Sequence, residues 1–190
     1  MEASADSSPA LYPHLLGARW LELDPAVRRA HGPGAAVRAI GSFTVRRGAG
    51  RLARLAGRAL RLPPAGSDVE VRLEVATAGG EERWRRRFGD HPLDSTQRGS
   101  GGGELIERFG ALELRFGLVV SGGGLSWVQR GAGLRLGPAR IPLPRWLSPH
   151  AAASEAPGGG PDRTRVAVRV TLPLAGLLIA YEGTMRREGP

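Results

Sequence analysis

Three stretches of this chain alternate apolar and polar side chains, and this pattern constrains the fold more than any other feature of the sequence. They cover residues 69–75, 112–120 and 166–172. A period of two places every apolar side chain on one face of a strand, so each stretch predicts a β-strand that is buried on one side. Glycine-rich turns, such as the one at 122–124, join neighbouring segments. Short connections favour antiparallel pairing, because parallel neighbours need long crossovers.

Two short helices are predicted before the strands. Apolar residues recur at helical spacing within residues 11–23. Asp24 and Pro25 are typical of an N-cap and a first helical residue, and Gly32 fits the end of that second helix. The glycine-rich segments 99–103 and 157–161 are predicted to be loops.

Residues 51–62 predict the clearest helix of the sequence. Leucines and alanines, including Leu52 and Leu55, occupy one side of a helical wheel, and arginines occupy the opposite side. These arginines are Arg51, Arg54, Arg58 and Arg61. We interpret the segment as a helix whose apolar side packs on the sheet while its arginines face solvent. Contact of the same helix with an anionic membrane surface is the alternative.

Together these patterns predict an α+β domain. Its sheet is expected to be strongly curved and mainly antiparallel, like a half-open barrel, with the N-terminal helices packed over it. Residues 1–10 are predicted to be a disordered tail and residues 11–187 a single domain. A sheet of this kind either fills its interior with side chains or encloses a ligand cavity. The inward residues are mainly Val, Leu, Phe and Trp, so a cavity would suit an apolar molecule.

The net charge of +9 comes from 27 basic residues that are all arginine, without a single lysine. Together with the abundance of Ala, Gly and Pro, this indicates GC-rich coding more than selection for a basic surface. Proteins that read nucleic acid interleave aromatic residues with basic patches, whereas only 5% of this chain is aromatic. The sequence therefore does not favour nucleic acid as a partner, and an anionic membrane surface remains an alternative.

Several chemistries find no support in the sequence. The absence of cysteine excludes disulfides, thiolate metal sites and cysteine nucleophiles. The four histidines are scattered, so no metal site is predicted. Residues 48–53 match a dinucleotide-binding fingerprint, but Arg46 and Arg47 stand where the apolar end of a Rossmann strand belongs, so no cofactor is predicted. The sequence leans away from an enzyme, and no catalytic residue is assigned.

The N-terminus lacks the basic and apolar regions of a signal peptide. The longest apolar stretch, residues 172–181, is too short for a membrane span. We therefore expect a cytoplasmic protein, with peripheral attachment to a membrane as the alternative.

A succession of short motifs runs through most of the chain in a characteristic order. They include Leu11-Tyr12-Pro13, Leu23-Asp24-Pro25, Gly41-Ser42-Phe43-Thr44-Val45, Trp84-Arg85-Arg86-Arg87-Phe88-Gly89, Glu107-Arg108-Phe109-Gly110, Ile141-Pro142-Leu143-Pro144, Pro173-Leu174-Ala175-Gly176 and Tyr181-Glu182-Gly183. The succession resembles the bacterial domain of unknown function family 4166. The resemblance implies a shared fold but no catalytic residues. Members of that family attached behind a saccharopine-dehydrogenase-like domain imply, as an alternative function, an enzyme or accessory domain of such an oxidoreductase system, with that oxidoreductase as a partner.

Two charged residues stand on apolar faces of predicted strands. The period of two places Arg86 on the side of Trp84 and Phe88, and it places Glu107 on the side of Leu105 and Phe109. A buried charge without a partner is costly, so the two residues are expected to pair with each other or with a ligand. An internal salt bridge that fixes the strand register is one interpretation. A polar anchor for an acidic or polar head group in an apolar pocket is the other.

The leading functional hypothesis is non-catalytic binding of a lipid-like or other hydrophobic small molecule in the curved sheet. The candidate ligand-binding residues are Trp84, Arg86, Phe88, Glu107, Phe109, Arg28, His31, Glu155 and Tyr181. Two alternatives come from other classes. One is an enzyme or accessory domain that uses Arg86, Glu107 and His31, and the other is an interaction module that docks through the helix at 51–62.

Overall fold

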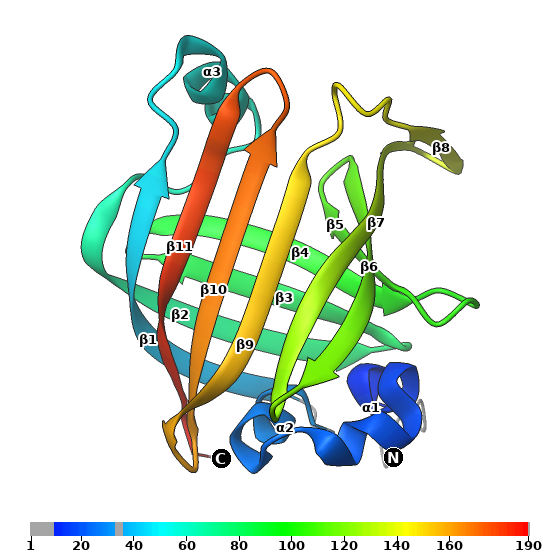
Figure 1. The fold of residues 1–190 in the computed structure, drawn as a ribbon, viewed down its shortest axis with the longest axis vertical. Helices are drawn as coiled ribbons and strands as arrows, with labels where there is room; N and C mark the ends of the chain where they lie inside the picture. Colours follow the sequence, from blue (N-terminus) through cyan, green and yellow to red (C-terminus); the bar gives the residue numbers. More distant parts are fainter. Residues whose placement is uncertain (1–9, 33–35, 190) are drawn as a thin grey trace, which may run out of the picture.

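The computed structural model describes residues 10–32 and 36–189, and its main feature is one antiparallel sheet (Figure 1). The sheet has 11 strands in the order β6-β5-β4-β3-β2-β1-β11-β10-β9-β7-β8. Their bounds are β1 Ala36–Arg47, β2 Gly66–Ala78, β3 Glu81–Phe88, β4 His91–Gly99, β5 Leu105–Phe109, β6 Leu112–Ser121, β7 Gly124–Leu136, β8 Ala139–Pro142, β9 His150–Gly160, β10 Arg163–Leu172 and β11 Gly176–Arg187.

The sheet closes into a barrel of ten strands, because β6 also pairs with β7. The predicted half-open barrel is therefore wrong, and the fold is mostly β. Strand β7 makes the closure: it pairs with β6 along its length, and its first residues, Leu125 to Val128, also pair with β9. Its last residues pair with the short strand β8, which lies beside the ring. The predicted loop at 157–161 overlaps β9, which has no alternating pattern in the sequence.

The period of two that predicted the strands is reproduced in their burial. In β2, Val71 and Val75 are buried and their neighbours face solvent, and in β3 the buried residues include Trp84 and Phe88. Glycine permits the close approach of β1 to β11, since a Cβ atom on Gly41 would collide with a backbone oxygen of β11. Glycines at such points are typical of sharply coiled sheets.

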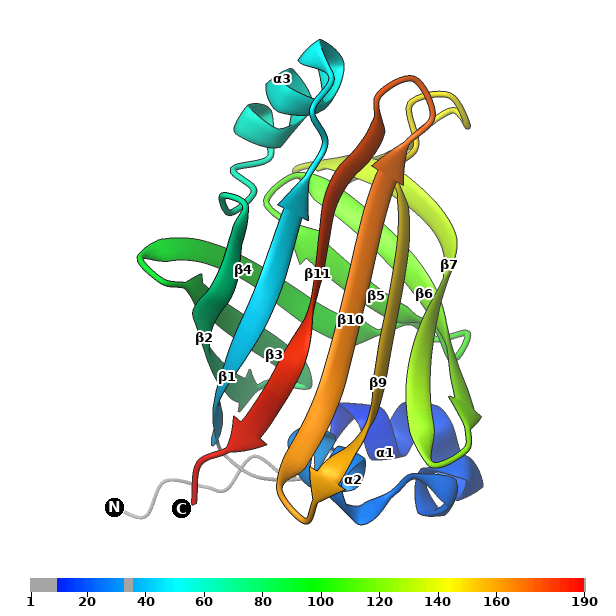
Figure 2. The ribbon, with the colours of Figure 1, turned by 60° about the vertical axis from the view of Figure 1, so that its left-hand side comes forward.

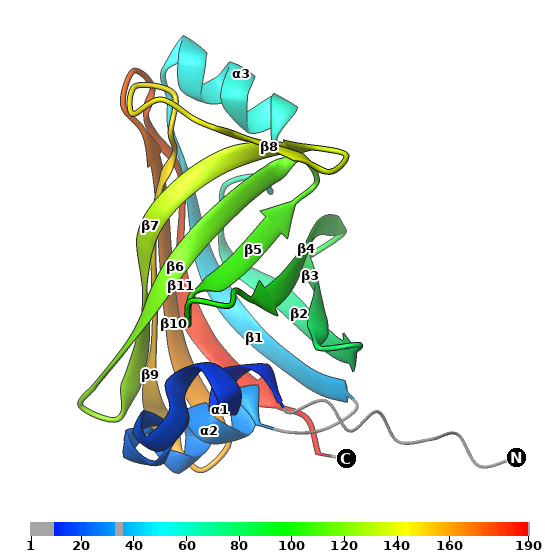
Figure 3. The same cartoon turned by 90° about the vertical axis from the view of Figure 1, so that its right-hand side faces the viewer.

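The N-terminal helices α1 (Leu11–Leu16), η1 (Gly17–Glu22) and α2 (Pro25–His31) cover one end of the barrel (Figures 1 and 3). The predicted start of α2 is confirmed: the Asp24 side chain accepts a hydrogen bond from the backbone N–H of Ala26 at 2.8 Å, and Pro25 is the first helical residue. The helix predicted at 11–23 is broken instead into an α-helix and a 3₁₀ helix at Gly17, whose φ of 55° is unfavourable for residues with a side chain.

Helix α3 (Arg51–Ala59) stands at the opposite end, outside the barrel (Figures 1 and 2). Its arginines face solvent as predicted, but the prediction that its leucines pack on the sheet is wrong. Leu52 and Leu55 are 55% and 65% exposed, whereas Ala53 is 1% exposed. The small side of the helix, Ala53 and Gly57, lies against the barrel because only small residues leave space for the Arg47 side chain beneath it.

Buried apolar residues form two clusters. One lies beneath α1 and α2 and contains Tyr12, Val27 and Trp84, and the other contains Phe43, Phe88 and Ile179. Within the described residues, no helix has both the length and the apolar composition to cross a membrane.

Candidate functional site

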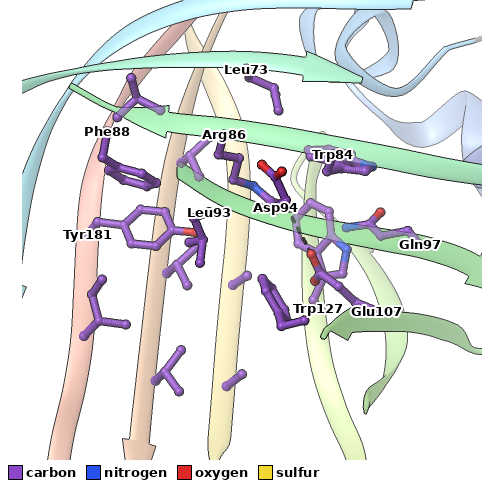
Figure 4. A pocket seen from close by; sticks show the side chains of 18 of the residues that line it. Leu73, Trp84, Arg86, Phe88, Leu93, Asp94, Gln97, Glu107, Trp127 and Tyr181 are labelled. Carbon is purple, nitrogen blue, oxygen red and sulfur yellow. Dashed lines mark hydrogen bonds and ion pairs between the residues drawn. The ribbon is translucent and has the colours of Figure 1, made fainter. Parts of the chain in front are cut away.

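A cavity of about 760 Å³ lies inside the barrel, and both apolar clusters contribute to its wall. The inner faces of the strands supply the lining, and Figure 4 shows Leu73, Phe88, Leu93 and Trp127 among the apolar side chains that point into it. The cavity stays open because β9 presents the small residues Ala151 and Ala153 to the interior. The interior is therefore a large apolar space with few polar groups.

The main polar group in this wall is an ion pair between Arg86 on β3 and Glu107 on β5. The Arg86 Nη2 atom lies 3.1 Å from Glu107 Oε1, and both side chains are largely buried. Ser95 on the intervening strand β4 joins them: its hydroxyl accepts a hydrogen bond from Arg86 Nη1 at 2.9 Å and donates one to Glu107 Oε1 at 2.7 Å. The Arg86 guanidinium also lies over the Trp84 ring, 4.8 Å from its centroid.

The hydroxyl of Tyr181 is a second polar group that points into the cavity (Figure 4). Its ring makes edge contacts with Phe88 and Phe43, at centroid distances of 5.1 and 6.0 Å. Burial raises the pKa of Tyr181, while Arg86 opposes this shift and Glu107 adds to it. In the part of the chain that the structure describes, this hydroxyl has no hydrogen-bond partner.

The end of the cavity beneath the helices is built around His31. Its Nε2 lies 2.7 Å from Glu155 Oε2, within hydrogen-bonding distance. The Nδ1 atom of His31 is buried and has no partner among the described residues. Its ring packs among Tyr12, Trp84 and Trp127, with centroid distances between 4.2 and 5.7 Å. Helix α2 thus closes the barrel with a histidine that is paired at Nε2 and unpaired at Nδ1.

The neighbouring polar groups at this end also pair with one another. The Tyr12 hydroxyl donates to Gln97 Oε1 at 2.7 Å and accepts from Trp127 Nε1 at 3.3 Å. Burial, and next the charge of Glu82, raises the pKa of Tyr12. Glu82 accepts a hydrogen bond from Trp84 Nε1 at 2.9 Å, and burial raises the pKa of its carboxyl.

Eight of the nine candidate residues line the cavity, and Arg28 is not among the lining residues. The eight are His31, Trp84, Arg86, Phe88, Glu107, Phe109, Glu155 and Tyr181. Sequence reasoning missed Ser95 and Gln97, although the alternation of β4 places both on the same face as Leu93. It also missed the contact of His31 with Glu155, because these residues are 124 positions apart and no local pattern connects them.

Gly48 is the first glycine of residues 48–53, the segment that matches a dinucleotide-binding fingerprint, and the structure explains why a glycine stands there. A Cβ atom there would collide with the backbone oxygen of Leu177 and with the side chain of Ala53. The glycine therefore permits the close packing of α3 on the start of β11. Among residues 10–32 and 36–189, no group of three or more His, Asp or Glu side chains is placed to hold a metal ion.

Three solved structures resemble the fold at low sequence identity. A protein of unknown function from the DUF3598 family of Nostoc punctiforme is 11% identical with a TM-score of 0.45, covering 81% of this chain and 47% of that one. A secretory abundant heat soluble protein from Ramazzottius varieornatus is 12% identical with a TM-score of 0.40, covering 80% and 93%. Transferrin binding protein B from Haemophilus parasuis is 9% identical with a TM-score of 0.35, covering 87% and 28%. The chain thus spans about half the length of the first of these, and all three likenesses are weak.

A search of curated proteins finds no significant match to the chain. A family model does match, over residues 23–185, which is most of the sequence and nearly the whole barrel with helix α2. This match agrees with the resemblance carried by the sequence motifs. The chain belongs to the family described as domain of unknown function DUF4166.

Proposed function

We propose that this protein binds a lipid-like or other hydrophobic small molecule inside its barrel. The observation that carries the proposal is the cavity of about 760 Å³ with a mainly apolar wall. Sites for small molecules are typically concave, about 300–1,000 Å³ in volume, and apolar apart from a few placed polar groups. The cavity has this size and composition, and Arg86, Glu107 and Tyr181 are among its polar groups.

The polar groups of the cavity favour binding over catalysis. Arg86, Ser95 and Glu107 are hydrogen-bonded to one another, and His31 is held by Glu155. These pairs satisfy most of the buried polar groups and fix the elements that carry them, while His31 Nδ1 has no partner among the described residues. An apolar ligand would gain about 0.8 kcal/mol for each methylene that it buries in such a space.

The test compares two tryptophan substitutions in neighbouring positions of β10. Val168 faces the cavity and Ala167 faces solvent. The protein is purified without detergent, and native mass spectrometry followed by denaturing analysis identifies any released molecule. We expect a hydrophobic molecule to copurify with the wild type and with Ala167→Trp, and to be lost from Val168→Trp. If the wild type neither carries such a molecule nor binds added hydrophobic probes, the proposal is wrong.

A second function is supported by the end of the barrel that carries α3. Here apolar side chains are exposed on three separate segments: α3, the β10–β11 turn, and residues 143–149 between β8 and β9. Figures 1 and 2 show these segments at the end of the barrel away from α1 and α2. The exposed residues include Leu52, Leu55, Trp146, Leu147 and Leu174.

The charged residues of these segments are all arginines. Residues 46–67, 134–154 and 163–181 contain arginines but no Asp or Glu. Exposed leucine and tryptophan side chains among arginines match the chemistry of a bilayer surface that contains anionic phospholipid. We infer that this end docks on such membranes, which would bring the cavity close to a source of apolar ligands.

Sedimentation with vesicles tests the docking surface. The wild type should bind vesicles of phosphatidylcholine with phosphatidylglycerol and leave vesicles of phosphatidylcholine alone in solution. Leu52→Asn with Leu55→Asn should weaken binding, whereas Leu21→Asn should not, because Leu21 is 73% exposed in η1 at the opposite end. Absence of binding to anionic vesicles, or equal loss with Leu21→Asn, would contradict the proposal.

A further inference from the structure

We infer that the ligand's polar group is uncharged: an ester, ether, carbonyl or hydroxyl oxygen in place of a carboxylate or phosphate. The inference rests on the proposed binding function and names the class of ligand. It differs from the sequence-based expectation, in which an arginine on the cavity wall would hold an acidic or a polar head group.

The charge of Arg86 is already compensated within the wall. Its guanidinium contacts Glu107 at 3.1 Å and Ser95 at 2.9 Å, and Asp94 also lines the cavity beside it (Figure 4). An acidic ligand bonded to the remaining N–H groups of Arg86 would place a second negative charge beside Glu107 in the same buried site. Two carboxylates that share one buried guanidinium repel each other, so Arg86 does not act as a free cation for a carboxylate.

The lining as a whole carries one more carboxylate than arginine. The charged residues that line the cavity, apart from His31, are three arginines and four carboxylates: Arg61, Arg86, Arg187, Asp94, Glu107, Glu155 and Asp162. Arg187 donates to the backbone oxygen of Arg29, and Asp162 pairs with the Arg29 side chain at 3.0 Å. The protein as a whole carries a net charge of +9, so its excess positive charge lies outside the cavity.

The cavity nevertheless offers a hydrogen bond to a neutral oxygen. The Tyr181 hydroxyl points inward and is without a partner among the described residues. It lies near enough to Arg86 and Glu107 for their charges to act on it. A guanidinium has five N–H groups, of which Ser95 and Glu107 each accept one here. An acceptor oxygen between Tyr181 and Arg86 would use these free donors without disturbing the ion pair.

The first measurement is displacement of a neutral fluorescent probe from the wild-type protein by palmitic acid, methyl palmitate and hexadecane. The acid and the ester have the same chain, so their difference reports the head group alone. Above neutral pH, we expect the ester to bind roughly tenfold more tightly than the acid, and more tightly than the alkane.

Glu107→Gln should reverse this preference. The glutamine oxygen still accepts hydrogen bonds from Arg86 and Ser95, but the guanidinium charge loses its counterion. We expect the affinity for palmitic acid to rise relative to the ester by roughly tenfold. Glu113→Gln is the matched control, because Glu113 is also buried and is bonded to Arg140 at 2.7 Å, but does not line the cavity. It should leave the ratio of the two affinities unchanged.

Tyr181→Phe tests whether the Tyr181 hydroxyl bonds to the ligand. This test does not depend on whether the Glu107 variant folds. It removes one hydroxyl and should weaken the affinity for methyl palmitate by roughly threefold to tenfold, which corresponds to the loss of one typical hydrogen bond. The affinity for hexadecane should not change. Tyr12→Phe removes a hydroxyl that is bonded to Gln97 and should not alter the ratio of ester to alkane.

The outcomes separate the two proposals. If neither the probe nor any of the three compounds binds, the proposed function is wrong. If the compounds bind but the wild type prefers the acid, binding stands and the inference about the head group is overturned. The inference is also overturned if Glu113→Gln shifts the preference as much as Glu107→Gln, because the effect would then come from the total charge of the protein.

Discussion

Arg86 on β3 and Glu107 on β5 face each other across β4, with 3.1 Å between Nη2 and Oε1. The Ser95 hydroxyl of the strand between them bonds to both partners. This arrangement connects three neighbouring strands through side chains, in addition to their backbone hydrogen bonds. A shift of one residue in any of the three strands would turn its polar member out of the barrel, so the cluster fixes the strand register.

Arg86→Leu should lower the free energy of unfolding by about 3–5 kcal/mol, because Glu107 would stay buried without its ionic partner. Urea denaturation of the wild type and the variant measures this difference. The exposed pair of Arg72 and Glu70 provides the comparison, and Arg72→Leu should leave stability nearly unchanged. Equal stability of Arg86→Leu and the wild type would show that the cluster does not support the fold.

Ser95→Ala should cost about 1–2 kcal/mol of stability, because the Arg86 and Glu107 side chains would each lose one hydrogen bond in a largely buried site. Ser126→Ala, on β7, provides a serine outside this cluster and should have little effect. Thermal unfolding of the two variants distinguishes a bonded serine from a serine that merely fits the strand. Equal loss in both would count against the linking role of Ser95.

Glu82 should make the protein less stable as the pH rises. Burial raises the pKa of its carboxyl in the folded state, so the folded protein binds more protons than the unfolded chain above the ordinary glutamate pKa of about 4.3. The stability that protonated Glu82 provides is therefore present at low pH and is lost as the pH rises through the raised value. Glu82→Gln should remove this dependence and keep the hydrogen bond from Trp84. Urea denaturation at a series of pH values measures the slope, which Glu74→Gln at an exposed position should leave unchanged.

Gly57→Ala should release α3 from the barrel. A Cβ atom at this position would collide with the guanidinium of Arg47, which donates to the backbone oxygens of Leu62, Pro63 and Leu178. We expect a net loss of about 1–2 kcal/mol, confined to the helix and its connection to β2. Hydrogen exchange of residues 51–62 should accelerate while that of the barrel strands does not. Alanine in place of the exposed Arg58 should leave exchange across this helix nearly unchanged.

Periodicity predicted the parts of this structure in which side chains alternate between two different environments. The Arg86–Glu107 pair emerged from that rule, since both residues interrupt an otherwise apolar face. The closure of the barrel was missed because β9 consists largely of alanine, glycine and proline, which show no contrast between its two faces. The second half of β7 also contains Gly131 and Gly133, which interrupt the pattern there.

The orientation of α3 escaped prediction for a different reason. A helical wheel shows that Leu52 and Leu55 share a side, but not which side has room to approach the barrel. The Arg47 side chain lies beneath α3, so only the small residues Ala53 and Gly57 fit on the side of the helix that faces the strands. The contact between His31 and Glu155 depends on where the whole N-terminal segment lies on the finished barrel, which no local pattern contains.

The pairing of β1 with β11 joins residues that are far apart in the sequence, with Ala39 opposite Arg187. Most other neighbours in the ring are consecutive hairpins, which can form as the chain leaves the ribosome. Until residue 187 has been synthesised, β1 and β10 both keep an open edge, and open edges are the usual route to aggregation. A chain whose strands form in the order of synthesis therefore completes ten strands before the ring can close, and a chaperone that shields strand edges would act at that stage.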